Sequence, residues 1–428
     1  MSEVANNLAV LCNEIGPRFA GTESYRRAAE FMVGQFAAYQ LNRPHLEPFA
    51  FTAWRRGVPA RLIITAPVTR EFECYALPYS PTTDCQAPLV NGGTGSVADL
   101  AGLGPGFVVT DGASGHRQEV YERLVARSFA GIILINRTPG GGLHTGSVGN
   151  GQPGKIPAVS VRYEDGQALR QLLAVGDVSA HLIADSHLEP ATTWNVVGEL
   201  PGSECPEELV IVGGHLDSHD IGPGAYDNAA GAVMVLEMAR LLAQRRGELK
   251  RTVRFIGFAA EEIGLLGSQH HARAHAEELR RARAMFNCDT PGLSRPWGLV
   301  TWNYPRAGEL AANVSRELGV EFGCREGKHN RSDQFPFTAL GVPAVVLSGG
   351  RGEMTPPFYL HMAGDTADRI PTAKLAAAAV MAAHIVLRLA NDPGRKNLER
   401  KPVGGVSNTT SSSEIHATNN GCAADDRL

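Results

Sequence analysis

Between about residues 193 and 390, the sequence alternates short segments that are apolar at almost every position with longer segments of helical periodicity. A strand that is apolar throughout must be covered on both faces, and α/β folds achieve this by laying helices on each side of a sheet. The pattern therefore predicts an α/β sheet with helices on both faces. The main predicted elements are strands at 209–215, 252–260 and 343–349, helices at 229–244 and 374–390, and a further helix from the end of the second strand through Ala282.

Composition excludes some classes of function without naming one. The chain has 428 residues and a formal net charge of −4, and its basic residues are spread along the sequence rather than clustered. A nucleic-acid-binding protein usually presents a basic face, so we expect no nucleic-acid partner. No run of about 18 apolar residues stands out, so we expect no membrane partner either.

The cysteines and the N-terminal residues indicate a compartment. The seven cysteines lie far apart and form no C-x-x-C motif, which fits free thiols in a reducing compartment better than a disulfide framework. The first residues lack the basic and apolar regions of a secretory signal. We therefore expect a cytoplasmic protein, or a secreted one if a leader has been removed.

Changes of composition divide the chain into four parts. Residues 1–54 are largely helical, and 55–190 are rich in Gly, Pro, Thr and Val and indicate short strands with turns. The alternating pattern then occupies 191–394. From 395 to 428 the chain is polar, with too little apolar surface to offset the entropy of ordering, so we predict a disordered tail.

Histidine and acidic side chains cluster near the ends of the apolar strands, where α/β folds place their ligands. Two histidines with three carboxylates form a mixed nitrogen and oxygen ligand set that suits two divalent ions sharing one carboxylate, either zinc or, as alternatives, cobalt or manganese. Such a pair activates a water and polarises a carbonyl, and a free carboxylate beside it can act as general base. The candidate residues are His215, Asp217, Asp227, Glu261, Glu262, Asp289 and His361.

The order of these motifs resembles the M28 family of di-zinc exopeptidases. H-L-D-S, G-A-Y-D-N-A-A-G, E-E, N-C-D-T-P-G and H-x3-D-T follow one another from His215 to Thr366. Each motif is weak alone, but their order is specific, and the resemblance extends over about residues 6–390. It implies the zinc exopeptidase fold, a three-layer mixed β-sheet flanked by helices, formed here by 1–54 together with 191–394.

The resemblance also implies a role for each candidate residue. Glu261 would be the general base, and Asp217 would orient His215. Two zinc ions per chain are implied, with no other cofactor. Their ligands would be His215 and Asp289 for the first ion, Glu262 and His361 for the second, and Asp227 as the bridge between them.

Residues 55–190 resemble a protease-associated (PA) domain, a mainly β lid that some members of the family carry as an insertion. The features are the apolar segment FAGIILIN after a helix, a glycine-rich loop, and IPAVSV followed by Tyr163. Such a lid would overhang the cleft and restrict access to short or unfolded peptides.

The expected activity is that of an aminopeptidase, in which a metal-bridging hydroxide formed with the help of Glu261 attacks the N-terminal peptide bond of a peptide. Dipeptidase or carboxypeptidase activity of the same fold is the alternative, and a glutaminyl-cyclase-like acyl transfer with one zinc is a further relative. A receptor-like binding protein without activity is the alternative from another class. No implied ligand is missing from the sequence, which argues against it. The oligomeric state is not predicted.

Other candidate sites have simpler explanations. Residues 149–155 are spaced like a nucleotide-binding loop, but Ile156 replaces the hydroxyl residue that binds magnesium, and Pro153 lacks an amide donor. His271 and His275 are four residues apart, but no H-E-x-x-H motif is present and charged neighbours indicate a solvated helix face. Cys288 is expected to be a packing residue.

Overall fold

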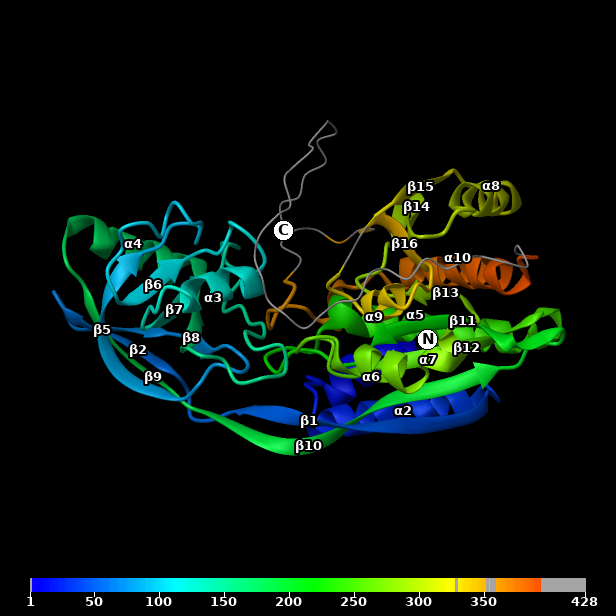
Figure 1. The fold of residues 1–428 in the computed structure, drawn as a ribbon, viewed down its shortest axis with the longest axis horizontal. Coiled ribbons are helices and arrows are strands. Elements are labelled where there is room, and N and C mark those ends of the chain that lie inside the picture. The colour runs from blue at the N-terminus through cyan, green and yellow to red at the C-terminus, as the bar shows by residue number, and fades with distance from the viewer. Residues whose placement is uncertain (1, 328–329, 352–353, 355–358, 394–428) are drawn as a thin grey trace.

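A computed structural model of the chain describes residues 2–327, 330–351, 354 and 359–393, and these contain two eight-stranded sheets. Each sheet belongs to a separate unit, and the two units lie side by side (Figure 1). The predicted disordered tail, 395–428, lies outside the described residues.

The first sheet is mixed. Strands β11, β12, β13 and β16 form its parallel centre, and the pairs β1–β10, β10–β12 and β14–β16 are antiparallel. In spatial order its strands are β1 (Asn42–Arg56), β10 (Ser186–Leu200), β12 (Arg251–Phe258), β11 (Cys205–His215), β13 (Ala282–Asn287), β16 (Ala344–Gly350), β14 (Ser294–Trp302) and β15 (Phe322–Glu326).

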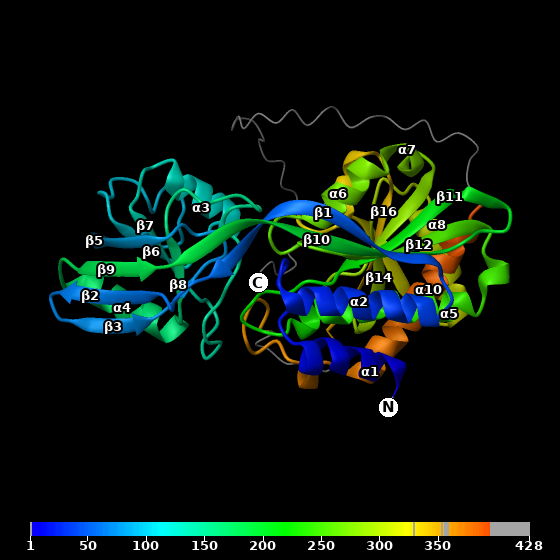
Figure 2. The same ribbon diagram turned by 90° about the horizontal axis from the view of Figure 1, so that it is seen from below.

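Helices cover both faces of this sheet. The longer helices α2, α5 and α10 lie on one face together with α1, and α6 and α7 lie on the other (Figure 2). Short π- and 3₁₀-helical turns occur at 10–15, 225–229, 246–248 and 367–369. The α-helices are α1 (Glu3–Ala9), α2 (Glu23–Ala38), α5 (Ala230–Ala243), α6 (Leu266–Ala274), α7 (Ala276–Leu279), α8 (Ala307–Leu318), α9 (Gln334–Ala339) and α10 (Thr372–Asn391).

The alternation of side chains along each strand explains why two cores are needed. Val210 and Val212 of β11 belong to the large core beneath α2, α5 and α10, whereas Leu209 and Ile211 belong to a smaller core on the opposite face. Successive residues of a strand point to opposite faces, so an all-apolar strand requires a helix layer on each side. The predicted three-layer arrangement around a mixed sheet is confirmed.

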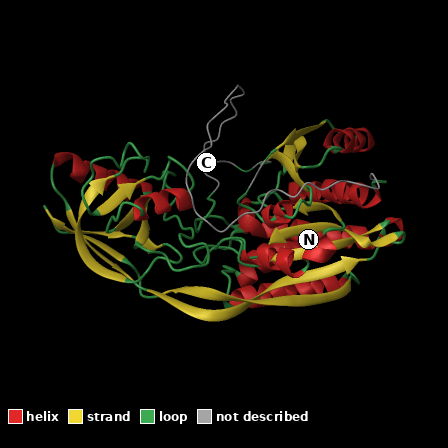
Figure 3. Ribbon diagram, viewed as in Figure 1, coloured by secondary structure: helices red, strands yellow, loops and turns green. Residues whose placement is uncertain are grey.

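The second unit is built by residues between the two long strands β1 and β10. Its helices α3 (Arg117–Val125) and α4 (Tyr163–Val175) contribute to separate cores on its two faces. Figure 3 shows β1 and β10 continuing from the first unit toward the second. The strands, in spatial order, are β3 (Arg70–Glu73), β2 (Arg61–Ala66), β9 (Ser179–Ala184), β5 (Thr83–Asn91), β6 (Phe107–Thr110), β7 (Gly131–Ile135), β8 (Ala158–Val161) and β4 (Tyr75–Ala76).

One local expectation is wrong. The helix predicted to run through Ala282 is interrupted at His275, where the backbone leaves the helical region; its second part, α7, ends at Leu279, and Ala282 begins β13. Among the described residues, α10 is long and apolar enough to cross a membrane by length and composition. Since 61% of its most apolar window is buried inside the protein, α10 has the character of a core helix.

Candidate metal centre

The site lies where the parallel strands of the first sheet end. His215 is the last residue of β11, Glu261 and Glu262 follow β12, and Asp289 follows β13. Since β11 pairs in parallel with both β12 and β13, these ends meet at one edge of the sheet. The topology therefore brings together side chains that are up to 74 positions apart (289 − 215).

Asp227 lies between two groups of potential ligands. Its Oδ1 is 3.2 Å from Nε2 of His215, and its Oδ2 is 3.2 Å from Nε2 of His361. Asp289 completes the first group with an oxygen 3.6 Å from His215 Nε2, and Glu262 adds an oxygen 3.4 Å from His361 Nε2. All five predicted metal ligands therefore converge, with Asp227 in the bridging position.

His219 was not predicted as a site residue, and the structure places it in the second group. Its Nε2 lies 2.9 Å from Oε2 of Glu262, and its ring stands edge-on to that of His361 with centroids 4.5 Å apart. Its position four residues after His215 in H-L-D-S-H was the available signal. Burial lowers the pKa of His219 well below its ordinary value.

Asp217 accepts hydrogen bonds from the backbone of both glutamates and also lies close to His215. Its Oδ1 accepts a hydrogen bond from the backbone amide of Glu261 at 3.2 Å, and its Oδ2 accepts one from the amide of Glu262 at 3.3 Å. Its backbone oxygen lies 3.2 Å from Nδ1 of His215, and its Oδ1 lies 3.6 Å away from the same nitrogen. The buried Asp217 thus fixes the loop after β12 relative to the end of β11.

The segment 331–343 supplies a hydroxyl that orients Asp289. Ser332 Oγ donates to Oδ2 of Asp289 at 2.6 Å, while the side-chain amide of Asn287 donates to the same Oγ at 2.7 Å. The free oxygen of Asp289 is thereby directed toward His215. Hydrogen bonds of this kind commonly orient the carboxylate ligands of metals.

Acidic side chains are crowded together in the site. Burial, together with the Asp227 carboxylate and against the opposing effect of His361, raises the pKa of Glu262 to about 8. Burial also raises the pKa of Glu261 well above its ordinary value, with further contributions from Asp289 and Glu262. Clustered buried carboxylates are unfavourable without a cation to compensate them.

The donors present fit divalent zinc. Two ligands bound about 2.1 Å from one zinc ion at a tetrahedral angle lie about 3.4 Å apart, and the described nitrogen–oxygen separations around Asp227 are 3.2 to 3.6 Å. Oε1 of Glu262 is buried and has no hydrogen-bond partner among the described residues. A carboxylate oxygen in this state is available for a metal.

The second unit reaches the site through its glycine-rich loop. The backbone amide of Thr145 donates to the carbonyl of His361 at 3.0 Å, and His144 forms an isolated antiparallel bridge with Met362. The rings of His144 and His361 have centroids 5.6 Å apart. The loop therefore contacts a predicted ligand directly.

Two other candidates from the sequence, residues 149–155 and Cys288, have no role in the site. Residues 149–155 lead into strand β8 at Ala158 rather than into a helix, so the arrangement of a nucleotide-binding loop is not formed there. Cys288 is buried with 2% of its surface exposed, as expected for a packing residue.

Residues 195–386 match the sequence profile of peptidase family M28. An aminopeptidase of Pseudomonas aeruginosa is 33% identical over an alignment of 300 residues, which covers 65% of this chain and 54% of that protein. The chain thus spans about half the length of this relative. Carboxypeptidase Q of Mus musculus is 26% identical over 388 residues, covering 84% of this chain and 79% of the relative.

Solved structures include proteins of the same architecture. A zinc aminopeptidase from Bacillus subtilis matches with a TM-score of 0.69 and 25% identity, covering 89% of this chain and 93% of that one. The agreement extends over both units of the chain. It supports the fold expected from the sequence, with its mixed sheet between two helix layers.

Proposed function

We propose that this chain, whose residues 195–386 match the sequence profile of peptidase family M28, is a zinc-dependent aminopeptidase that removes N-terminal residues from peptides. The observation that carries the proposal is the position of Asp227, whose two oxygens face His215 and His361. One carboxylate between two sets of nitrogen and oxygen donors suits a pair of neighbouring zinc ions.

The proposed ligands of the two zinc ions correspond to the two groups of donors on either side of Asp227. His215 and Asp289 hold the first zinc, Glu262 and His361 hold the second, and Asp227 is shared. When bound, the two ions lower the pKa of a water molecule and polarise the carbonyl of the substrate. Cobalt or manganese can occupy the same donors, because both accept imidazole and carboxylate ligands.

Glu261 is the proposed general base. Its side chain is partly exposed beside the buried ligands, and it follows a strand whose end is fixed by Asp217. A carboxyl group whose pKa is raised toward neutrality accepts a proton from water more readily and returns it more readily to a leaving amine. The raised pKa of Glu261, caused first by burial, fits that double task.

We further propose the domain organisation of the chain. Residues 1–54 and 191–394 form the catalytic domain, and 55–190 form a PA lid. The contact between Thr145 and His361 supports a lid that limits the site to short or unfolded peptides.

A panel of substrates tests the proposed activity. Aminoacyl p-nitroanilides and peptides with a free amine but an amidated C-terminus should be hydrolysed, whereas the same peptides with an acetylated amine should not. Hydrolysis of N-acetylated peptides that have a free C-terminus would instead assign a carboxypeptidase, the activity that the name of the Mus musculus relative carries. Cleavage restricted to free dipeptides would assign a dipeptidase.

A further inference from the structure

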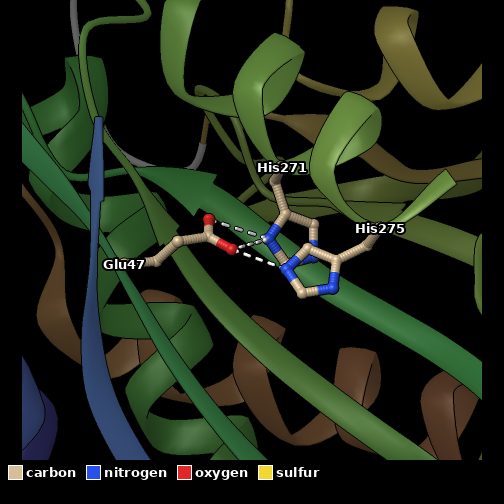
Figure 4. Close-up of side chains that lie close together, drawn as sticks. All are labelled: Glu47, His271 and His275. Carbon is tan, nitrogen blue, oxygen red and sulfur yellow. Dashed lines mark hydrogen bonds and ion pairs between the residues drawn. The ribbon is translucent and has the colours of Figure 1, made fainter. Parts of the chain in front are cut away.

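A second group of potential metal ligands lies away from the proposed catalytic centre. It consists of Glu47 on β1, His271 on α6 and His275, the residue that ends α6 (Figure 4). The sequence indicated a solvated helix face for the two histidines. That expectation is wrong for His271, which is fully buried. Its ring packs against the rings of Phe258 and Phe337.

The donor atoms of the three side chains converge on one position. Nδ1 of His271 lies 3.1 and 3.0 Å from the two oxygens of Glu47, and Nε2 of His275 lies 2.7 Å from Oε1 of Glu47. The two imidazole rings lie one above the other, with centroids 4.3 Å apart. Residues four apart on a helix present their side chains on the same face, which explains how α6 brings both rings to one carboxylate.

Groups surrounding the three donors hold two of them in place. The side-chain amide of Asn195 donates to Oε2 of Glu47 at 2.8 Å. Nδ1 of His275 lies 3.2 Å from Oε2 of Glu278, so this imidazole has a carboxylate on the side opposite Glu47. A carboxylate behind a histidine and a hydrogen bond behind an acidic ligand are the supports that metal-binding residues commonly have.

We propose that Glu47, His271 and His275 bind a divalent transition-metal ion of the zinc class, at a site separate from the proposed catalytic pair. Two imidazoles and one carboxylate form a recurring zinc ligand set with three protein donors. Glu47 is 8% exposed and His271 is 0% exposed, whereas the side chain of His275 is 30% exposed. The fourth position of a tetrahedral ion is therefore filled by water from the side of His275.

The bound ion would link two elements that serve different parts of the molecule. Strand β1 continues toward the second unit, and α6 follows the loop that carries Glu261 and Glu262. An ion that binds the folded protein and not the unfolded chain stabilises the fold, and the stabilisation increases with the ratio of free ion concentration to Kd. We therefore assign the site a structural role.

Metal analysis of matched variants tests the site. After zinc saturation and removal of free metal, His275→Gln and Glu47→Gln should each contain one zinc fewer per chain than the wild type. His270→Gln is the control, because His270 is the neighbouring histidine on α6 and stacks on Phe49 outside the cluster. Equal zinc content in the wild type, His275→Gln and His270→Gln would overturn the proposal.

Two further measurements separate this site from the catalytic one and guard against a variant that fails to fold. His275→Gln should hydrolyse peptides at the wild-type rate, while added zinc should raise its thermal midpoint by less than it raises that of the wild type. A zinc-edge anomalous map of wild-type crystals should show a peak between Glu47 and His275. A map of zinc-saturated crystals without that peak would also overturn the proposal, whatever the catalytic centre contains.

Discussion

The carboxylate of Asp365 accepts a hydrogen bond from the backbone amide of Asp227 at 3.0 Å, and its other oxygen accepts one from the amide of Tyr226 at 2.8 Å. Asp365 is almost completely buried, with 2% of its surface exposed. It follows His361 by four residues, so one short segment supplies both a proposed ligand and the group that positions the shared carboxylate. The orientation of Asp227 between the two donor groups depends on this contact.

Replacement of Asp365 by Asn should therefore weaken the centre. The substitution removes one of the two acceptors and directs an amide donor at a backbone N–H, which disturbs Asp227. Loss of such a supporting group typically lowers metal affinity or activity about 10- to 100-fold. Zinc titration and kcat/KM measure the effect. Asp368→Asn, at an exposed position three residues later, should change neither value, and an unaltered zinc affinity in Asp365→Asn would contradict this role.

The glycine-rich loop that contacts His361 provides a test of the proposed lid. A Cβ at Gly146 would lie 1.9 Å from Cζ of Arg117, whose Nε donates to the carbonyl of Ser147 at 3.0 Å. Gly146→Ala should therefore displace the guanidinium and the loop that contacts His361. We expect kcat/KM to fall about three- to tenfold, less than the hundredfold that a 1 Å misplacement of reacting groups can cost, with zinc content unchanged.

A second glycine in the same loop provides the control for that experiment. Gly142 also has a positive φ, of 77°, but an added Cβ there meets no atom within 4 Å. Gly142→Ala therefore reproduces the backbone strain without the collision. If the two alanine variants had equal kcat/KM, backbone strain would account for the effect and the contact with Arg117 would not.

The sequence was sufficient to predict that acidic and histidine side chains following the apolar strands meet at one edge of the sheet. His215, Glu262 and Asp289 each end or follow an apolar strand, and parallel strands must bring such ends to one edge. The position of His219 was not predicted, because whether its ring turns toward Glu262 depends on packing against Phe19, with which it stacks.

The sequence pattern also could not predict contacts between segments that are far apart in the chain. The spacing of His271 and His275 defines one helix face, but it does not indicate that Glu47, more than 220 positions earlier, lies opposite them. The pairing of β1 with β10 and of β10 with β12 brings Glu47 there. A single sequence contains no local signal for such a register.

His116 should make the stability of helix α3, in the second unit, depend on pH. Its Nδ1 accepts a hydrogen bond from the backbone amide of Gln118 at 3.3 Å, which caps the helix. Burial, with the nearby Arg117 and Arg331, lowers the pKa of His116 to about 4. Between about pH 6.5 and about pH 4, the unfolded chain binds a proton at His116 that the folded chain does not bind. The free energy of unfolding therefore has its full value above about pH 6.5 and falls as the pH decreases.

His116→Asn should remove this dependence, since asparagine is a good N-cap residue and does not titrate. The decrease in thermal midpoint between about pH 7 and about pH 5 should be smaller in the variant than in the wild type. Both proteins are compared at the same zinc concentration. His187→Asn, which changes a side chain that is 64% exposed, should behave as the wild type, and an equal decrease in His116→Asn would contradict the role of the cap.

The central claim is that Glu261 moves the proton at a metal centre assembled by the other residues. The direct measurement is the zinc content and the kcat of Glu261→Gln, determined on the same preparation with an aminoacyl p-nitroanilide. We expect unchanged zinc bound at the proposed catalytic ligands and a kcat reduced about 10²- to 10⁴-fold, the range expected for loss of a general acid–base group. Wild-type kcat in a variant with full zinc content would contradict it.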